Sequence, residues 1–190
     1  MHYFSLDIET TGLDPEMDQI LEIGVVVDTQ HGRKTLRLVA NLPRITGDVR
    51  ALVLNSELIE DIARLRETGL TNSTEDDKVV FVPPQQFIGE FFEWLTEIGC
   101  SGQRILLAGK NIGAFDIQFI KKLPDWDLLR KCVGHRYLDI GTLYYSPFDD
   151  GVRLPDLKTC CERAGVDRVD PHTGLGDAED VLNCLRSHYG

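Results

Sequence analysis

The segment 4–15 constrains the fold of this chain more than any other, because it combines a strand pattern with closely spaced acids. Apolar and polar residues alternate along its first half, which predicts a β-strand. Successive side chains of a strand point to opposite faces, so Asp7 and Glu9 share one face while their apolar neighbours enter a core on the other. The sequence therefore places two carboxylates side by side at the end of a buried strand.

This carboxylate pair needs a compensating interaction, because neighbouring anions repel each other. A hard divalent cation such as Mg²⁺ or Mn²⁺ supplies it, since oxygen ligands suit both ions. Taken alone, Asp-x-Glu is also typical of a strand end whose carboxylates cap the following turn. The other acidic residues of the chain decide between these interpretations.

Length and composition limit the class of protein. The 190 residues fit one domain with a full-sized core, so we expect a single domain over residues 1–190. A hydrophobic share of 42% is typical of a soluble globular protein, and no stretch approaches the ~20 apolar residues of a membrane span. The N-terminus lacks the basic and apolar regions of a secretory signal. We therefore expect no contact with a membrane.

Cysteine usage indicates the redox compartment of the protein, and its charge limits the length of nucleic acid that it can bind. The five cysteines, of which Cys160 and Cys161 are adjacent, show no metal-knuckle spacing, so we expect free thiols in a reducing cytoplasm. The net charge of −11 argues against a protein that coats long nucleic acid through many phosphate contacts. It is compatible with an enzyme that holds a few nucleotides, and bound cations would offset part of this charge.

Hydrophobic periodicity predicts three successive strands, followed by helices that alternate with short strands. Strands after the first are expected at 19–29, 34–42, 105–108 and 137–139, with a polar, acidic loop at 69–78. Helices are expected at 56–67, 84–98, 115–123, 154–164 and 176–189. This order predicts an α/β fold with a mixed sheet covered by helices.

Three further residues extend the acidic pair. Asp116 lies near the start of a predicted helix, Asp177 opens the last helix, and His172 precedes Asp177 by five residues. Each has a simpler explanation, because a first-turn carboxylate stabilises the helix dipole and a loop histidine is often merely solvated. Together, however, they bring the set to four carboxylates and one imidazole from three separated segments.

The order and spacing of this set resemble the DnaQ-like, DEDDh class of 3′-to-5′ exonucleases over nearly the whole chain. In that class an Asp-x-Glu strand, a later Asp, and a His followed five residues on by Asp build the site. The resemblance implies an RNase H-like fold, a mixed β-sheet flanked by α-helices. It also implies two Mg²⁺ or Mn²⁺ ions and a histidine general base. The implied metal ligands are Asp7, Glu9, Asp116 and Asp177, and the implied base is His172.

Within this class, three segments look like oligoribonuclease: 11–15, 134–140 and 172–177. The chain departs from that family's pattern at Thr10, Ile112, His135 and the acidic loop 69–82. These positions lie where that family grips the ends of short RNAs. The resemblance therefore implies the catalytic class and leaves the choice between DNA and RNA open.

The resemblance also implies contacts with the terminal nucleotide. The candidate contact residues are Thr10, Thr11, Gly12, Leu13, Asn111 and Phe115. Leu13 is expected to pack against the base, although a simple turn explains Gly12 equally well. Phe115 is a candidate for base stacking, with core packing as its alternative.

The expected substrate is the 3′ end of single-stranded DNA or RNA, including short oligonucleotides. Whether the chain acts alone, as a homodimer or beside a polymerase is open. The expected reaction is attack of water on a phosphodiester, which releases a 5′-nucleoside monophosphate. Two cations ~3.5–4 Å apart stabilise the attacking and leaving oxygens, and a neutral imidazole accepts the proton.

Two alternative functions remain open from the sequence. One is a phosphohydrolase that uses Asp7 as a nucleophile, which an aspartyl-phosphate intermediate would reveal. The other is a non-catalytic or polymerase-associated proofreading module on the same fold.

Overall fold

The structure, a computed structural model, describes residues 3–168 and 172–190. Within these residues six strands form one sheet in the order β4-β3-β2-β1-β5-β6. The strands are β1 (Tyr3–Thr10), β2 (Ile20–Thr29), β3 (Gly32–Ala40), β4 (Asp77–Val82), β5 (Leu106–Gly109) and β6 (Leu138–Asp139). β1 to β3 pair antiparallel, whereas β4, β5 and β6 each join a neighbour in parallel. The predicted mixed sheet is confirmed.

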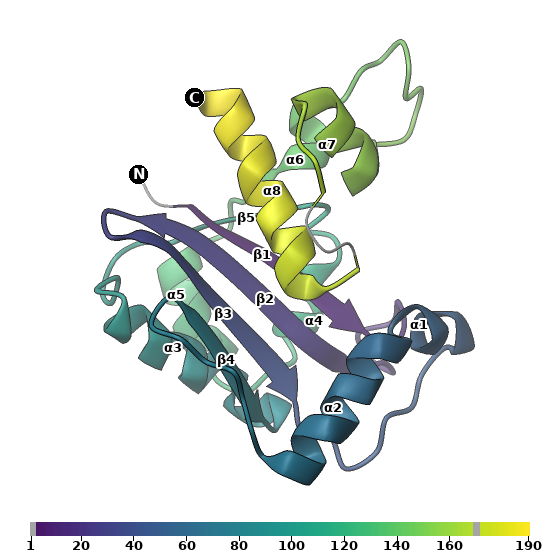
Figure 1. The fold of residues 1–190 in the computed structure, drawn as a ribbon. Helices are drawn as coiled ribbons and strands as arrows, with labels where there is room; N and C mark the ends of the chain where they lie inside the picture. The colour runs from purple at the N-terminus through teal and green to yellow at the C-terminus, as the bar shows by residue number, and fades with distance from the viewer. Residues whose placement is uncertain (1–2, 169–171) are drawn as a thin grey trace.

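Helices cover both faces of this sheet (Figure 1). They are α1 (Val49–Leu54), α2 (Ser56–Thr68), the 3₁₀ turn η1 (Pro84–Gln86), α3 (Phe87–Glu97), α4 (Asp116–Ile120), α5 (Trp126–Val133), α6 (Ile140–Leu143), α7 (Leu157–Ala164) and α8 (Gly174–Tyr189). The last helix, α8, crosses β1 and β2 on one face, while α3 and α5 lie behind the sheet (Figure 1). The N-terminal end of α8 thereby reaches the carboxyl end of β1.

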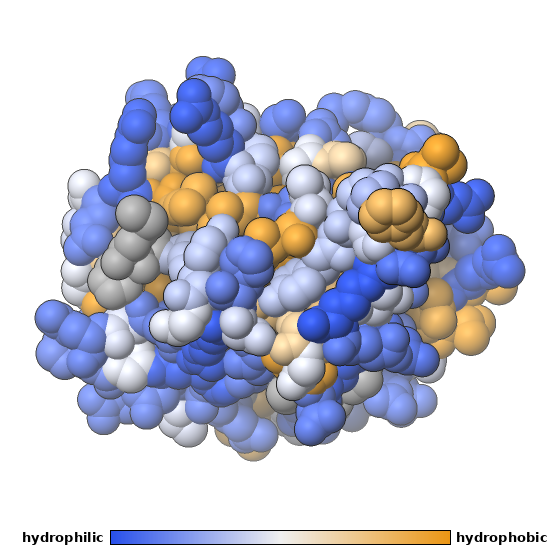
Figure 2. Space-filling model, turned by 90° about the horizontal axis from the view of Figure 1, so that it is seen from above, coloured by the Kyte–Doolittle hydropathy of each residue, from blue (hydrophilic) through white to orange (hydrophobic). Residues whose placement is uncertain are grey.

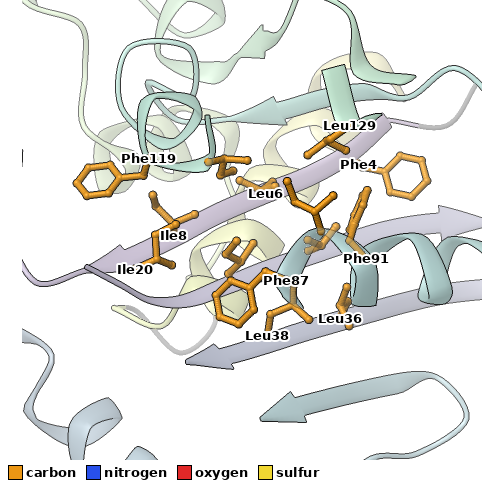
Figure 3. Packing of buried hydrophobic residues seen from close by; sticks show 14 of the residues in the cluster. Phe4, Leu6, Ile8, Ile20, Leu36, Leu38, Phe87, Phe91, Phe119 and Leu129 are labelled. Carbon is orange, nitrogen blue, oxygen red and sulfur yellow. The ribbon is translucent and has the colours of Figure 1, made fainter. Parts of the chain in front are cut away.

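The main core lies between the sheet and α3. Phe4, Leu6 and Ile8 of β1 point toward Phe87 and Phe91 of α3 (Figure 3), and all of them are at most 6% exposed. The alternation predicted for β1 is therefore confirmed on its apolar side. Hydrophilic side chains cover most of the outer face seen from above, with hydrophobic residues in patches between them (Figure 2). No helix among the described residues is long and apolar enough to cross a membrane.

The structure corrects several predicted elements. The acidic segment predicted as a loop over 69–78 overlaps a strand, because β4 begins at Asp77 and pairs with β3 over Thr35–Ala40. Neighbouring-strand pairing stabilises this edge strand, and periodicity within the segment does not reveal such a partner. Three short helices, α1, α5 and α6, were also missed, since four to eight residues give little periodic signal.

Two glycines bring α8 close to the sheet. A Cβ added to Gly24 of β2 would lie 2.2 Å from the carbonyl carbon of Gly174, the first residue of α8. A Cβ added to Gly174 would lie 3.3 Å from the carbonyl oxygen of Asp7. The helix therefore starts directly on the backbone of β1 and β2. Thr173 caps this start, because its hydroxyl oxygen accepts the Gly176 N–H at 3.0 Å.

We expect Gly24→Ala to destabilise the protein by about 1–3 kcal/mol, because the new methyl group would push the start of α8 off the sheet. Gly89→Ala is the matched control. Gly89 lies within α3 and an added Cβ there meets no atom within 4 Å, so it should stabilise the protein by about 0.5–1 kcal/mol. Urea unfolding of both variants measures the difference. Equal stability of the two variants would contradict the close contact.

Candidate active site

Three of the predicted carboxylates lie together where α8 meets β1. Asp7 and Glu9 project from β1, and Asp177 projects from the first turn of α8. One carboxylate oxygen from each lies within 4.8 Å of the others. We call these three residues the acidic trio. The strand alternation that places Asp7 and Glu9 on one face thus aims both at the helix.

The fourth carboxylate, Asp116, lies outside the trio but next to it. It begins α4 after β5, is 2% exposed, and its Oδ1 accepts the backbone N–H of Ile8 at 3.2 Å. Its negative charge raises the pKa of Asp7, second only to burial. Asp116 therefore faces β1 between the two acids of that strand, held by a backbone donor.

His172 stands at the edge of the site. Its backbone has a φ of 69°, its side chain is exposed, and its N–H donates to Oδ1 of Asp177 at 3.3 Å. The residue lines a groove of ≈ 350 Å³ between the start of α8 and the helices α1 and α2. The other residues that line this groove are Arg37, Leu54, Asn55, Ser56, Glu57, Leu58, Asp61 and Thr173. Its exposed imidazole is thus available to a ligand in the groove.

The carboxylates of this site repel one another. Burial and the neighbouring carboxylates raise the pKa of Asp7 well above its ordinary value. Burial, with the charges of Asp177 and Glu22, raises the pKa of Glu9 to about 7. Burial likewise raises the pKa of Asp116 to about 8 and also raises that of Asp177. An all-oxygen donor set with this much repulsion fits a hard divalent cation, which would favour the ionised carboxylates.

Several neighbours of the trio are not evident from the sequence. Glu22 of β2 pairs opposite Glu9, is fully buried, and accepts Nε of Arg37 at 2.7 Å and the Leu175 N–H at 3.2 Å. It therefore ties the first turn of α8 to the sheet. A charged residue within the apolar run of β2 is the signal that could have found it, since a buried acid requires a partner.

Asn55 and Arg168 also contact the site. The Asn55 amide donates to the Thr10 carbonyl at 3.1 Å, and its hydrogen bond to Glu9 opposes the rise in pKa of that carboxyl. Arg168 forms an ion pair with Asp177. No local pattern reveals these contacts, because each joins segments that are distant in sequence or separated by a loop.

The turn after β1 is tightly held. Thr11 is fully buried; its hydroxyl oxygen accepts the Gln19 N–H at 2.9 Å, and its carbonyl accepts the Asp48 N–H at 2.7 Å. A Cβ on Gly12 would lie 2.2 Å from the Asp18 carboxylate, so any larger residue here would displace that side chain. Leu13, by contrast, is 84% exposed. The turn thus presents an apolar side chain on a rigid base.

The segment before α4 is divided between surface and core. Asn111 is exposed with a φ of 60°, and the N–H of Phe115 returns to its carbonyl at 3.0 Å. Phe115 packs partly buried against the core, with its ring 5.2 Å from that of Phe119. Ile112, where the chain departs from the oligoribonuclease pattern, is fully buried. The structure therefore gives Phe115 the core contact that was the alternative to base stacking.

Comparison with known proteins identifies the family. The family model RNase_T, described as "Exonuclease", matches residues 4–185. An oligoribonuclease from Hahella chejuensis is 33% identical over 190 residues, which cover 95% of this chain and 89% of that protein. An oligoribonuclease from Marinobacter nauticus is 28% identical over 192 residues, covering 97% and 91%.

Solved structures share the fold at low identity. The nuclease domain of 3′hExo, a DEDDh family member bound to rAMP, aligns with a TM-score of 0.62 at 16% identity, covering 98% of this chain and 90% of that chain. Exonuclease I of E. coli in complex with a dT13 oligonucleotide aligns with a TM-score of 0.62 at 12% identity. The chain covers only 40% of that exonuclease I chain. These likenesses confirm the RNase H-like arrangement predicted above.

The fold and its acidic site therefore define a nuclease of the DEDDh, DnaQ-like type, and the chain belongs to the RNase T exonuclease family as a 3′-to-5′ exonuclease. Of the functions left open by the sequence, this assignment supports the exonuclease over the phosphohydrolase with an Asp7 nucleophile.

We expect the cation-free protein to lose stability as pH rises, and Asp116→Asn to reduce that loss. The folded-state pKa of Asp116, about 8, lies above the ordinary value of a carboxyl, so folding favours the protonated form. The contribution is complete below the ordinary pKa of ~4 and is lost as pH passes through about 8. Asparagine keeps an oxygen for the Ile8 N–H and carries no titratable proton.

Urea unfolding in a chelator between pH 5 and pH 9 measures this difference. Asp127→Asn serves as the control, since the Asp127 side chain is 84% exposed. If wild type and Asp116→Asn lose stability in parallel over this range, the burial of the Asp116 charge has no thermodynamic consequence.

Proposed function

We propose that this exonuclease degrades short single-stranded oligonucleotides, RNA in preference, from the 3′ end and releases 5′-nucleoside monophosphates. The observation that carries the proposal is the acidic trio with Asp116 beside it. Two relatives that match this chain nearly end to end are oligoribonucleases, which supports short RNA as the substrate. We also infer that residues 1–190 act as one exonuclease domain in the cytoplasm.

The trio and Asp116 would hold two Mg²⁺ or Mn²⁺ ions. Four carboxylates with raised pKa values form an all-oxygen donor set, which suits these hard cations. When bound, such a pair supplies positive charge for the attacking and leaving oxygens of a phosphodiester.

The chain's own residues supply the remaining chemistry. His172, exposed on the groove beside Asp177, would accept the proton of the attacking water. The hydrogen bonds of Thr10 and Thr11 hold the turn rigid, so that its backbone can receive the terminal nucleotide. Leu13 and Leu54, which are 84% and 69% exposed, offer apolar surfaces for its base.

The short length of the substrate follows from charge. The chain carries 20 basic and 31 acidic residues, and many of its arginines and lysines are paired with acids. A long strand needs many phosphate contacts, each of which contributes to affinity. A short oligonucleotide can be held mainly through its terminal nucleotide at the groove. Homodimer formation and association with a polymerase remain predictions.

The direct test is digestion of 5′-labelled single strands of two to about twenty nucleotides, in both sugars, with free or blocked 3′ ends. We expect hydrolysis that requires Mg²⁺ or Mn²⁺, needs a free 3′ hydroxyl, and is fastest on RNA of a few nucleotides. Faster digestion of long DNA would contradict the proposed substrate. Early release of the labelled 5′ nucleotide from an otherwise intact strand would contradict the direction of attack.

We expect His172→Ala to lower kcat by about 10²–10⁴-fold while Mn²⁺ binding is retained, because the imidazole accepts a proton and lies outside the acidic trio. Single-turnover kinetics and calorimetric Mn²⁺ titration measure the two effects. His31→Ala is the control, since His31 is an exposed residue of the β2–β3 turn. Normal turnover in His172→Ala would remove the general-base role.

A further inference from the structure

Arg168 joins two acidic residues of α8. Its Nε donates to Oδ2 of Asp180 at 2.8 Å, and its Nη2 donates to Oδ1 of Asp177. Asp180 is fully buried, while the Arg168 side chain is 19% exposed. One guanidinium therefore binds a buried anchor with one arm and a member of the acidic trio with the other.

The contact with Asp177 uses an oxygen that has a second donor. Oδ1 of Asp177 also accepts the backbone N–H of His172 at 3.3 Å. The same oxygen is thus shared by Arg168 and by the residue that carries the candidate general base. A divalent cation at the trio must approach Asp177 within the field of a fixed guanidinium.

We propose that Arg168 is a positioning residue that occupies Asp177 in place of a divalent cation and thereby sets the cation affinity of the site. This inference rests on the proposed function, since it assumes that the trio binds divalent ions. The Asp180 arm keeps the guanidinium in place, and the Asp177 arm offsets part of the repulsion within the trio. Cation binding then has to overcome this contact, because two positive charges repel each other at one carboxylate.

Arginine is suited to this task by its planar fork, which reaches two carboxylates at once. Asp177 and Asp180 are three residues apart, so they lie on one side of α8 and within reach of one guanidinium. A lysine ammonium is a compact point charge and cannot reproduce both contacts in the same geometry. The buried Asp180 should keep a lysine at this position, which would leave Asp177 without its second arm.

Two variants with opposite expected effects test the proposal. Arg168→Lys should bind Mn²⁺ on the order of three- to tenfold more tightly than wild type, since the competing arm is removed from Asp177. Asp180→Asn should bind Mn²⁺ about two- to fivefold more weakly, since neutralising the anchor leaves the Arg168 charge more fully on Asp177. Calorimetry and Mn²⁺ paramagnetic resonance without substrate measure both affinities.

Arg163→Lys is the matched control. Arg163 forms a bidentate ion pair with the single carboxylate of Asp150, at 2.6 and 2.8 Å, and Asp150 is not a member of the trio. Its exchange should leave the Mn²⁺ affinity unchanged. Melting temperatures in a chelator supply a second readout, in which Arg168→Lys should be lower than wild type and should approach it when Mn²⁺ is added.

Unchanged Mn²⁺ affinity in Arg168→Lys, or shifts of both variants in the same direction, would overturn the role of Arg168 and leave a purely structural ion pair. If Arg168→Lys does not fold, Arg168→Gln takes its place, and unchanged Mn²⁺ affinity in that variant would likewise overturn the role of Arg168. A wild-type protein that binds no Mn²⁺ would contradict the proposed function itself, which separates the two failures.

Discussion

The repulsion among carboxylates at the contact between β1 and α8 governs the rest of this structure. Gly24 and Gly174 allow the helix to begin on the backbone of the sheet, and that contact brings Asp177 to Asp7 and Glu9. A fold that gathers acids in this way must contain compensating groups. The arrangement of those groups explains why the site is built from several elements and how it can hold divalent ions.

Compensation in the protein itself is incomplete. The Ile8 N–H stabilises the Asp116 carboxylate, and Arg168 pairs with Asp177, yet the pKa of each of these acids stays above its ordinary value. Arg37 fulfils a similar role for Glu22, which in turn holds the first turn of α8. The residual repulsion is largest at Asp7, where four other acids act on one buried carboxyl. Divalent cations would remove this repulsion, which links cation binding to stability.

The parts of this site that depend on local chemistry were predictable. Strand alternation placed Asp7 and Glu9 on one face, and the order and spacing of the whole set of acids with His172 carried the resemblance that the family match confirms. Contacts between distant segments were not predictable. Glu22 lies opposite Glu9 only because of the register of β2 against β1. β4 was missed for the same reason, since a strand is stabilised by a neighbour that the local pattern does not show.

The direct measurement of the central claim is the anomalous diffraction signal of Mn²⁺ in crystals of the protein grown with the ion and a non-hydrolysable dinucleotide. We expect two Mn²⁺ peaks within coordination distance of the oxygens of Asp7, Glu9, Asp116 and Asp177. Peaks elsewhere on the molecule, with the four carboxylates still bonded only to protein groups, would contradict the claim that this acidic cluster exists to hold divalent ions.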